Sequence, residues 1–357
     1  MVISTMSEKS LSRGLTLVEL LITLALSLIL LSGLIPLFLA SKTTYQLHQS
    51  LAQIQETARY AASIMSQDIR MAGFRGCASR YVDYTNQLAN PPATFTPARG
   101  IAGWEAKDTA TGYYTLTTHS PVTDASLATN WITSQTDTPM LDSGTFVVAQ
   151  SDILRIWQVN GDSVSSILQG TQLQATQTPP YATRDVILLS NCRTAALILA
   201  CRVSGKTTDL ACAENAMLPA PSSAGWQVWQ AAGWLYYVGK RSRQATQPPT
   251  LYRRMISQNA TAETPQELVE GVESLQIMYG EDTNNDDIAD QTVTANQVTN
   301  WQNVISVQID LLVRGLNPVL APDEPQDINF NGANFTAQDG YLRYPFSVTI
   351  ALRNRIP

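Results

Sequence analysis

Hydrophobic residues are concentrated near the start of the chain. Leu20–Ser41 runs without a charged side chain and consists mainly of Leu, Ile and Ala. A helix of this length spans the hydrocarbon core of a bilayer, which requires about 20 apolar residues. Lys9 and Arg13 precede the run, so the positive-inside rule places this flank in the cytoplasm and the residues after 41 outside it. The pattern predicts one membrane-spanning segment, as an uncleaved anchor or a secretory peptide would also have.

A second hydrophobic pattern follows directly. Apolar residues recur every three or four positions with polar and charged residues between them, up to Gly73. This periodicity predicts an amphipathic helix over residues 42–73 that continues the apolar segment. Because a large body follows, we favour packing of the apolar stripe on a sheet of the same chain over a coiled-coil seam. The stripe consists of Leu47, Leu51, Ile54, Ala58, Ala61, Met65 and Ala72.

Residues 74–357 have the pattern of a β-rich body. Short runs rich in Val, Ile and aromatic residues alternate with turn residues, which predicts an antiparallel sheet. In the last two runs, apolar side chains alternate with polar ones, so each run presents one apolar face. The fold class is therefore α+β, with a long N-terminal helix packed on a large antiparallel β-sheet head. The predicted strands are Phe146–Ala149, Asp152–Val159, Arg184–Ser190, Ala195–Cys201, Trp226–Trp229, Trp234–Gly239, Leu251–Ile256, Leu275–Gly280, Val304–Val313 and Tyr344–Leu352.

Two parts of the body interrupt this pattern. Residues 81–145 are rich in Thr, Asn and Pro, which predicts long loops or an irregular insertion. The run Thr264-Pro265-Gln266-Glu267 has a capping box with Pro at the first helical position, which predicts a short helix to about Val269.

Composition and charge exclude several classes of function. The chain has 357 residues and a formal net charge of −6, and no basic block is present that would bind a phosphate backbone. Only two histidines occur, His48 and His119, so a His-based triad or a His-rich metal site is not expected. Gly205-Lys206-Thr207 lacks the earlier glycine of a phosphate loop, because Ala200 stands there, so nucleotide binding is also not expected. No nucleophile and base pair is evident, and we expect no enzymatic activity.

Glu19 lies at the start of the apolar run, where a carboxylate costs a few kcal/mol without a partner. The run Arg13-Gly14-Leu15-Thr16-Leu17-Val18-Glu19-Leu20-Leu21 resembles the class III leader junction of type IV pilins. The resemblance implies that a prepilin peptidase cuts between Gly14 and Leu15 and methylates the new amine. Leu15 stands where the family usually has Phe. Pro36 lies at a depth where pilins commonly carry a proline, which bends or melts the helix.

The same resemblance assigns a role to Glu19. As the fifth residue of the mature chain, it would neutralise the terminal ammonium of a neighbouring subunit when helices stack in a filament. The implied parts are a leader over 1–14, a membrane and filament-core segment over 15–41, the amphipathic segment over 42–73 and the head over 74–357.

Segments beyond the leader resemble the PilW family of minor pilins. These segments are Gln49–Arg59, Asp68–Cys77, Leu268–Gln276 and Thr349–Arg355. The resemblance implies a low-abundance subunit that joins other minor pilins and the major pilin in the priming or tip complex of a type IV pilus. It also implies a single-pass inner-membrane protein with a periplasmic head, which later becomes part of the surface pilus. The alternatives are a pseudopilin of a type II secretion system, a membrane-anchored periplasmic enzyme and a calcium-dependent adhesin.

The cysteine count fits an exported head. Cys77, Cys192, Cys201 and Cys212 allow two disulfides in three pairings. We favour Cys77 with Cys192, which would tie the helix end to the sheet, and Cys201 with Cys212, which would close a short loop.

An acidic segment has the spacing of a calcium loop. Asp282, Asn284, Asp286 and Asp290 occupy positions 1, 3, 5 and 9, and the carbonyl of Ile288 would be a further ligand. Asp287 replaces the usual glycine at position six, and Val293 replaces the bidentate glutamate at position twelve. The alternative is a solvated acidic turn between strands. A second run, Asp327–Gly332, is interpreted as an Asx-rich turn.

Overall fold

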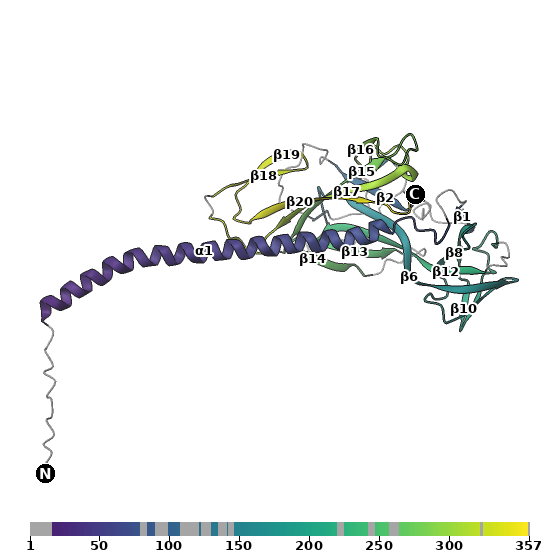
Figure 1. Cartoon of the computed structure of the whole chain (residues 1–357), viewed down its shortest axis with the longest axis horizontal. Helices are drawn as coiled ribbons and strands as arrows, with labels where there is room; N and C mark the ends of the chain where they lie inside the picture. The colour runs from purple at the N-terminus through teal and green to yellow at the C-terminus, as the bar shows by residue number, and fades with distance from the viewer. Residues whose placement is uncertain are drawn as a thin grey trace, which may run out of the picture. The chain divides into compact units, whose positions relative to one another are not determined.

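The computed structural model describes residues 16–78, 84–89, 99–107, 121–122, 130–134, 141, 146–219, 225–241, 247–256, 264–321 and 324–355. It divides the chain into two compact units, Met1–Gln49 and Ser50–Pro357. The first unit contains most of a long helix, and the second contains the end of this helix and the β-rich head (Figure 1).

The long helix α1 runs from Leu17 to Arg70 and includes Pro36, so the chain stays helical on both sides of this proline. All side chains from Thr16 to Gln46 are exposed, although most of them are apolar. Among the described residues, α1 is the one helix long and apolar enough to cross a membrane. The prediction of a long, initially apolar N-terminal helix is confirmed.

The second part of α1, from Ser50 onward, packs on the head. Its buried residues recur at helical spacing and include Ile54, Ala58, Ala61 and Met65. They share one core with residues of two sheets, among them Tyr236, Val238, Leu251, Val307, Ile309 and Leu311. The apolar stripe therefore covers a sheet of its own chain, as expected. The helix ends at Arg70 and is followed by Gly73 at a φ of 68°, the left-handed conformation that terminates helices.

Most strands belong to one large sheet. Within the described residues it has 14 strands, and its centre is the antiparallel pair β6 (Ile153–Gln169) and β12 (Trp226–Gly239). The two runs predicted within 226–239 form one strand, because Gln230, Ala231 and Ala232 continue the pairing with β6. Almost all pairings are antiparallel, whereas β1 (Tyr84–Asn86) runs parallel to β9 (Ala195–Leu199).

A second sheet contains the C-terminal strands. Its strands follow the order β16 (Gln291–Val293), β15 (Val272–Glu281), β17 (Val304–Arg314) and β20 (Arg343–Ala351), and all of its pairings are antiparallel. In β17 (Val304–Arg314), the residues Val307, Ile309, Leu311 and Val313 are buried against α1 and the rest of the main core. The residues between them point to the outer face, so the predicted alternation is confirmed.

A separate hairpin, β18–β19, lies over part of this outer face. Its two strands are joined by Asn331 and Gly332, both at positive φ, as a two-residue hairpin turn requires. The hairpin buries Ile328, Phe330, Ala333 and Ala337 together with Leu312 of β17. The run interpreted as an Asx-rich turn is thus the end of one strand and the turn of this hairpin.

The short helix predicted to end near Val269 is wrong. Gln266–Glu270 is strand β14, which pairs with β13 (Thr250–Ile256). Gly271 has a φ of 91°, which ends the segment that begins after Pro265. A helix confined to this segment would be too short to be stable without packing. Arg253 also binds Gln266, and Arg241 binds Glu267.

The insertion predicted over 81–145 is partly regular where it is described. Ile101–Ala106 is strand β2, whose six residues are all buried and which pairs with β6 and β4. The remaining strands are β3 (Pro121–Val122), β4 (Trp131–Ile132), β5 (Val147–Val148), β7 (Gln172–Ala175), β8 (Val186–Ser190), β10 (Arg202–Ser204), β11 (Thr207–Asp209), β15 (Val272–Glu281), β16 (Gln291–Val293), β18 (Gln326–Phe330), β19 (Ala333–Ala337) and β20 (Arg343–Ala351), with a 3-10 turn at Trp301–Asn303.

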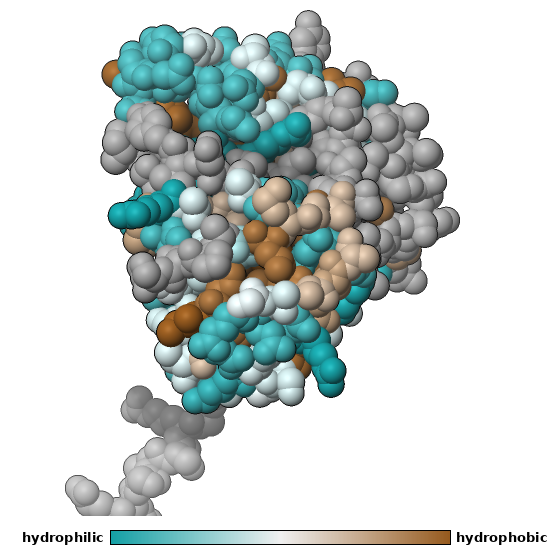
Figure 2. Space-filling view, turned by 90° about the vertical axis from the view of Figure 1, so that its right-hand side faces the viewer, coloured by the Kyte–Doolittle hydropathy of each residue, from teal (hydrophilic) through white to brown (hydrophobic). Residues whose placement is uncertain are grey.

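Figure 2 shows one side of the molecule, on which hydrophilic residues cover most of the described surface and apolar residues gather in a small central group. The largest exposed hydrophobic side chains belong chiefly to α1, where Phe38 is 70% and Leu37 is 67% exposed. A surface of this kind needs a bilayer or other helices to cover it.

Candidate functional site

The N-terminal end of α1 contains Glu19 in a capping box with Thr16. The backbone N and Oγ1 of Thr16 each donate to Oε2 of Glu19 at 3.0 Å, and the N of Glu19 donates to Oγ1 of Thr16 at 3.3 Å. This reciprocal pair satisfies donors that the first helical turn leaves without partners. The spacing Thr-x-x-Glu was visible in the sequence, where Glu19 was considered only as a partner for another subunit.

Of the other residues predicted to act in cleavage, methylation or assembly, the structure describes only Pro36. Gly14 and Leu15, where cleavage and methylation are expected, lie outside the described residues. Pro36 lies inside α1, which is assigned as one continuous helix, so the proline does not melt it. Glu19 and Pro36 thus both lie on the exposed, apolar part of the helix.

Both expected disulfides are present. Cys77 pairs with Cys192, with a Cα–Cα distance of 4.6 Å, and Cys201 pairs with Cys212, with a distance of 6.0 Å. The first bond joins the segment after α1 to the loop after β8, across 115 residues of sequence. The second encloses the hairpin β10–β11, in which Gly205 and Lys206 form the turn. The two bonds fix the helix end and one margin of the large sheet.

In the acidic loop after β15, the carboxylates of Asp282, Asp286 and Asp290 accept hydrogen bonds from other residues of the same loop. Asp282 accepts hydrogen bonds from the backbone N of Asn285, Asp286 and Asp287, at 2.6, 3.3 and 2.9 Å. Oδ1 of Asp286 accepts from the N of Ile288, at 2.9 Å. These are the contacts of a chain of Asx turns.

Asp290 closes the loop through Thr283. Its Oδ2 accepts hydrogen bonds from the hydroxyl and the backbone N of Thr283, each at 2.7 Å, and these hold the pKa of Asp290 below its usual range. Asn284 donates to both Asp286 and Asp290.

These contacts do not form a ready calcium site. No group of three or more His, Cys, Asp or Glu side chains converges as metal ligands anywhere in the part of the chain that the structure describes. The arrangement fits a self-capped acidic turn, and calcium binding by Asp282, Asn284, Asp286, Ile288 and Asp290 stays a prediction. Calorimetric titration of the protein with calcium chloride tests it, since a real site would lose its heat in Asp286→Ala.

A buried polar cluster joins α1 to the large sheet. Asp68 accepts hydrogen bonds from the hydroxyl of Tyr236, from Nη1 of Arg253 at 3.2 Å and from Nε2 of Gln158 at 3.1 Å. The guanidinium of Arg253 also lies 4.2 Å from the ring centroid of Trp234. Burial and the negative charge of Asp68 raise the pKa of Tyr236 well above its usual range, so it stays a donor. We call these four residues, Asp68, Gln158, Tyr236 and Arg253, the helix clamp.

A second buried polar cluster connects the two large sheets. Asp152 accepts hydrogen bonds from the N of Ala106 in β2 and the N of Ile277 in β15, each at 2.8 Å, and also bonds to the Glu105 side chain. Burial raises the pKa of Asp152 to about 7, against the effect of these hydrogen bonds. The buried carboxyl of Asp152 therefore keeps its proton to a higher pH than an exposed aspartate does. Neither cluster was predicted, because the residues of each are far apart in the sequence.

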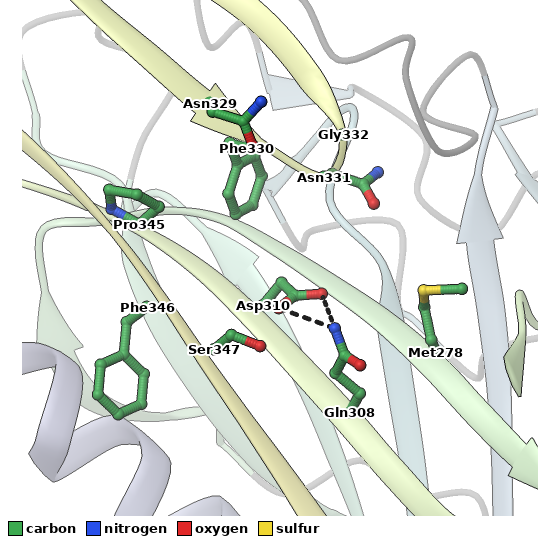
Figure 3. Close-up of a pocket in the computed structure, with 10 residues that line it drawn as sticks. All are labelled: Met278, Gln308, Asp310, Asn329, Phe330, Asn331, Gly332, Pro345, Phe346 and Ser347. Carbon is green, nitrogen blue, oxygen red and sulfur yellow. Dashed lines mark hydrogen bonds between the residues drawn. The ribbon is translucent and has the colours of Figure 1, made fainter.

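A cavity of about 310 Å³, lined by both polar and apolar residues, lies on the outer face of the second sheet, beside the hairpin β18–β19 (Figure 3). Its floor is formed by Met278, Gln308, Asp310 and Ser347, which point away from the core. Nε2 of Gln308 donates to both carboxylate oxygens of Asp310, at 3.2 and 2.9 Å. The ring of Phe346 points to the other face of the sheet.

Comparison with known proteins adds two matches. Residues 9–35 match the model of the prokaryotic N-terminal methylation motif, and residues 235–354 match the model of type IV pilus-assembly protein W, called PilW. No curated protein and no solved structure matches the chain. The first match covers the leader junction and the start of α1, and the second covers the strands from the second half of β12 to β20.

The methylation-motif match, the long apolar helix α1 and the disulfide-bonded β-sheet head together support a type IV pilus-related pilin. Within this class, the match over residues 235–354 supports assignment of the chain to the PilW family. The resemblance found in the sequence is confirmed over the leader junction, Leu268–Gln276 and all but the last residue of Thr349–Arg355, whereas Gln49–Arg59 and Asp68–Cys77 lie outside both matches.

Proposed function

We propose that this protein is a minor pilin that joins other minor pilins in the priming or tip complex from which a type IV pilus grows. Its role is structural, and its partners are other minor pilins, the major pilin and the prepilin peptidase. Before assembly it spans the inner membrane once with its head in the periplasm, and afterwards it belongs to the pilus.

The observation that carries this proposal is the exposed apolar part of α1 with Glu19 at its start. In a bilayer, lipid tails cover this surface, and transfer to a bundle of similar helices changes its apolar contacts little. A carboxylate in this position gains most from a neighbouring cation, which the terminal ammonium of another cleaved subunit would supply. The capping box holds the carboxylate at the helix end until then.

Replacement of Glu19 tests this role. We expect Glu19→Ala to leave cleavage after Gly14 intact and to reduce the protein in sheared pili at least tenfold, since the neighbour's amine would lose its partner. Immunoblots of the membrane and pilus fractions measure both effects. Glu56→Ala, at an exposed position farther along α1, serves as the matched control and should assemble normally. Unchanged surface pili in Glu19→Ala would contradict the proposal.

A pseudopilin of a type II secretion system is the alternative, because it shares the leader and the helix. Deletion of the gene separates the two. Loss of surface pili and twitching motility supports a pilus role, whereas loss of secreted exoproteins with intact pili supports the pseudopilin. The match to a pilus-assembly family favours the first.

A further inference from the structure

Strand β20 forms one edge of the second sheet. It pairs with β17 on one side, and no other strand of the described chain pairs with its opposite side. Along β20, Pro345, Ser347, Thr349 and Ala351 are all exposed. The outward backbone groups of Arg343 are bonded to Gln326 of β18, and beyond this residue the edge has no strand partner in the described chain. An unpaired edge of this kind is a template on which another chain can add a strand.

The hydrogen bonds of Arg343, the first residue of β20, show which backbone N–H and C=O groups of this strand face the outer edge. The N of Arg343 donates to Oε1 of Gln326 at 2.9 Å, and its carbonyl oxygen accepts from Nε2 of the same side chain at 2.8 Å. Both backbone groups of Arg343 therefore point away from β17. Along a strand, the backbone N–H and C=O groups of successive residues point to alternate sides. The backbone groups of Ser347 and Thr349 therefore also point away from β17. Pro345 fits this pattern, since its missing N–H faces the edge and costs no ladder hydrogen bond.

The cavity that contains Asp310 opens beside this edge. Ser347 lies directly across from Asp310 of β17, and Thr349 lies across from Gln308. A strand added to β20 would lie two strand spacings from β17, about 9.5 Å. A long side chain on that strand can pass over the small Ser347 and reach Asp310.

The chemistry of the cavity selects a cation. Asp310 is partly buried, and Gln308 is its hydrogen-bond partner, while no Lys or Arg of the described chain forms an ion pair with it. Asn329 and Asn331 of the hairpin add amide groups at the rim, and Met278 and Pro345 offer apolar surface. A Lys or Arg side chain matches this lining, because its stem packs on apolar atoms while its head binds the carboxylate.

We propose that the free edge of β20 binds an extended segment of a neighbouring pilin and that a Lys or Arg of this segment enters the cavity at Asp310. This inference rests on the proposed role in pilus assembly and adds the position and chemistry of one contact. Main-chain hydrogen bonds along Ser347 and Thr349 supply affinity, and the cation at Asp310 fixes the position of the added strand.

The test is site-specific photo-crosslinking in piliated cells that produce the full chain. A benzoylphenylalanine at Thr349 should crosslink to one segment of another pilin that contains Lys or Arg, identified by mass spectrometry of the joined peptides. The same probe at Gln172, exposed in the other sheet, should not give this product. Asp310→Lys should lower the yield at Thr349 at least tenfold, because like charges would meet in the cavity.

Two further variants separate the backbone from the side chain. Ser347→Pro removes one outward N–H at a position like that of Pro345 and should also abolish the product, whereas Ser347→Ala keeps the N–H and should retain it. Circular dichroism and the thermal midpoint of the purified full-length variants confirm that each one folds.

Three results would overturn the proposal: no product at Thr349 in protein recovered from pili, a product unaffected by Asp310→Lys and Ser347→Pro, or a product with a second copy of this chain. If these results occur while Glu19→Ala still blocks incorporation, only the docking surface is wrong. If deletion of the gene leaves pili unchanged, the proposed function fails and this inference falls with it.

Discussion

Single buried residues in the head control its response to pH, and Asp152 is the clearest case. Its carboxyl connects β2 and β15 and is completely enclosed, so burial raises its pKa to about 7. An acid with a raised pKa in the folded state stabilises that state when protonated. This contribution is complete below the unfolded pKa, near 4, and is lost as pH rises through about 7. Carboxylates such as Asp290 and Asp339, whose pKa values are lowered, act below this window.

We therefore predict that the urea concentration at the unfolding midpoint of the full-length protein in detergent decreases as the pH is raised from 5 to 8. Glu105→Gln should flatten this dependence, because an amide N–H at this position can donate to the ionised carboxylate of Asp152 and so lower its pKa. Asp162→Asn, at an exposed site of β6, is the control and should keep the slope. A midpoint that is constant or rises across the window would show that Asp152 is ionised throughout.

Among single residues, those with a local sequence pattern could be predicted from the sequence, whereas those whose role depends on distant partners could not. Glu19 and the four cysteines were predicted because a charge in an apolar run and an even cysteine count are visible in one dimension. Asp68, Glu105 and Asp152 were missed because each depends on partners more than 40 residues away, such as Tyr236 and Ile277. Asp310 was missed because only the fold places an open strand edge beside it.

Among the elements, α1 was the most predictable. Its apolar run and its later stripe are both strong periodic patterns, and the described helix extends from Leu17 to Arg70. Short segments were less predictable. The capping box over 264–267 competes with the pairing of β14 on β13, and pairing prevails because Gly271 ends the segment after five strand residues. Strand β2 was not predicted, because Ile101–Ala106 is short and lies in a region poor in apolar repeats.

The helix clamp gives a prediction for the attachment of α1 to the head. Asp68→Ala leaves the hydroxyl of Tyr236 and the guanidinium of Arg253 without their shared acceptor. Breaking a buried pair usually costs 3–5 kcal/mol, and the partial exposure of Arg253 reduces this to about 2–3 kcal/mol of unfolding free energy. Chemical denaturation of the full-length protein measures it. Glu56→Ala should change the free energy by less than about 0.5 kcal/mol, and an equally small change for Asp68→Ala would refute the clamp.

For the whole molecule, the two disulfides differ in what they hold. The Cys77–Cys192 bond closes 115 residues, and the Cys201–Cys212 bond closes 11. Because the entropy lost by the unfolded chain grows with the length of the closed loop, removal of the longer bond should cost more. We expect the double variant Cys77→Ser with Cys192→Ser to lose about 3–4 kcal/mol of unfolding free energy.

The double variant Cys201→Ser with Cys212→Ser is the matched comparison and should lose about 2 kcal/mol less. Denaturation of both variants under non-reducing conditions makes the comparison. Equal losses, or a larger loss for the shorter loop, would contradict the assignment of the longer bond as the main cross-link of the head.

The proposed function is that of a subunit that passes from a membrane to a filament. The apolar part of its helix is exposed, its head is held by buried polar clusters and disulfides, and the outer edge of β20 has no strand partner among the described residues. Each feature suits a protein whose surfaces are covered by other subunits. The proposed helix contact depends on cleavage of the leader, since in this proposal a free amine next to Glu19 of another subunit completes the contact.

The N-terminal peptide of the protein recovered from sheared pili tests this dependence most directly. Mass spectrometry should find a peptide that begins at Leu15 and carries one methyl group on its α-amine. A protein that begins at any other residue, or that stays in the membrane fraction while pili are made, would contradict the account.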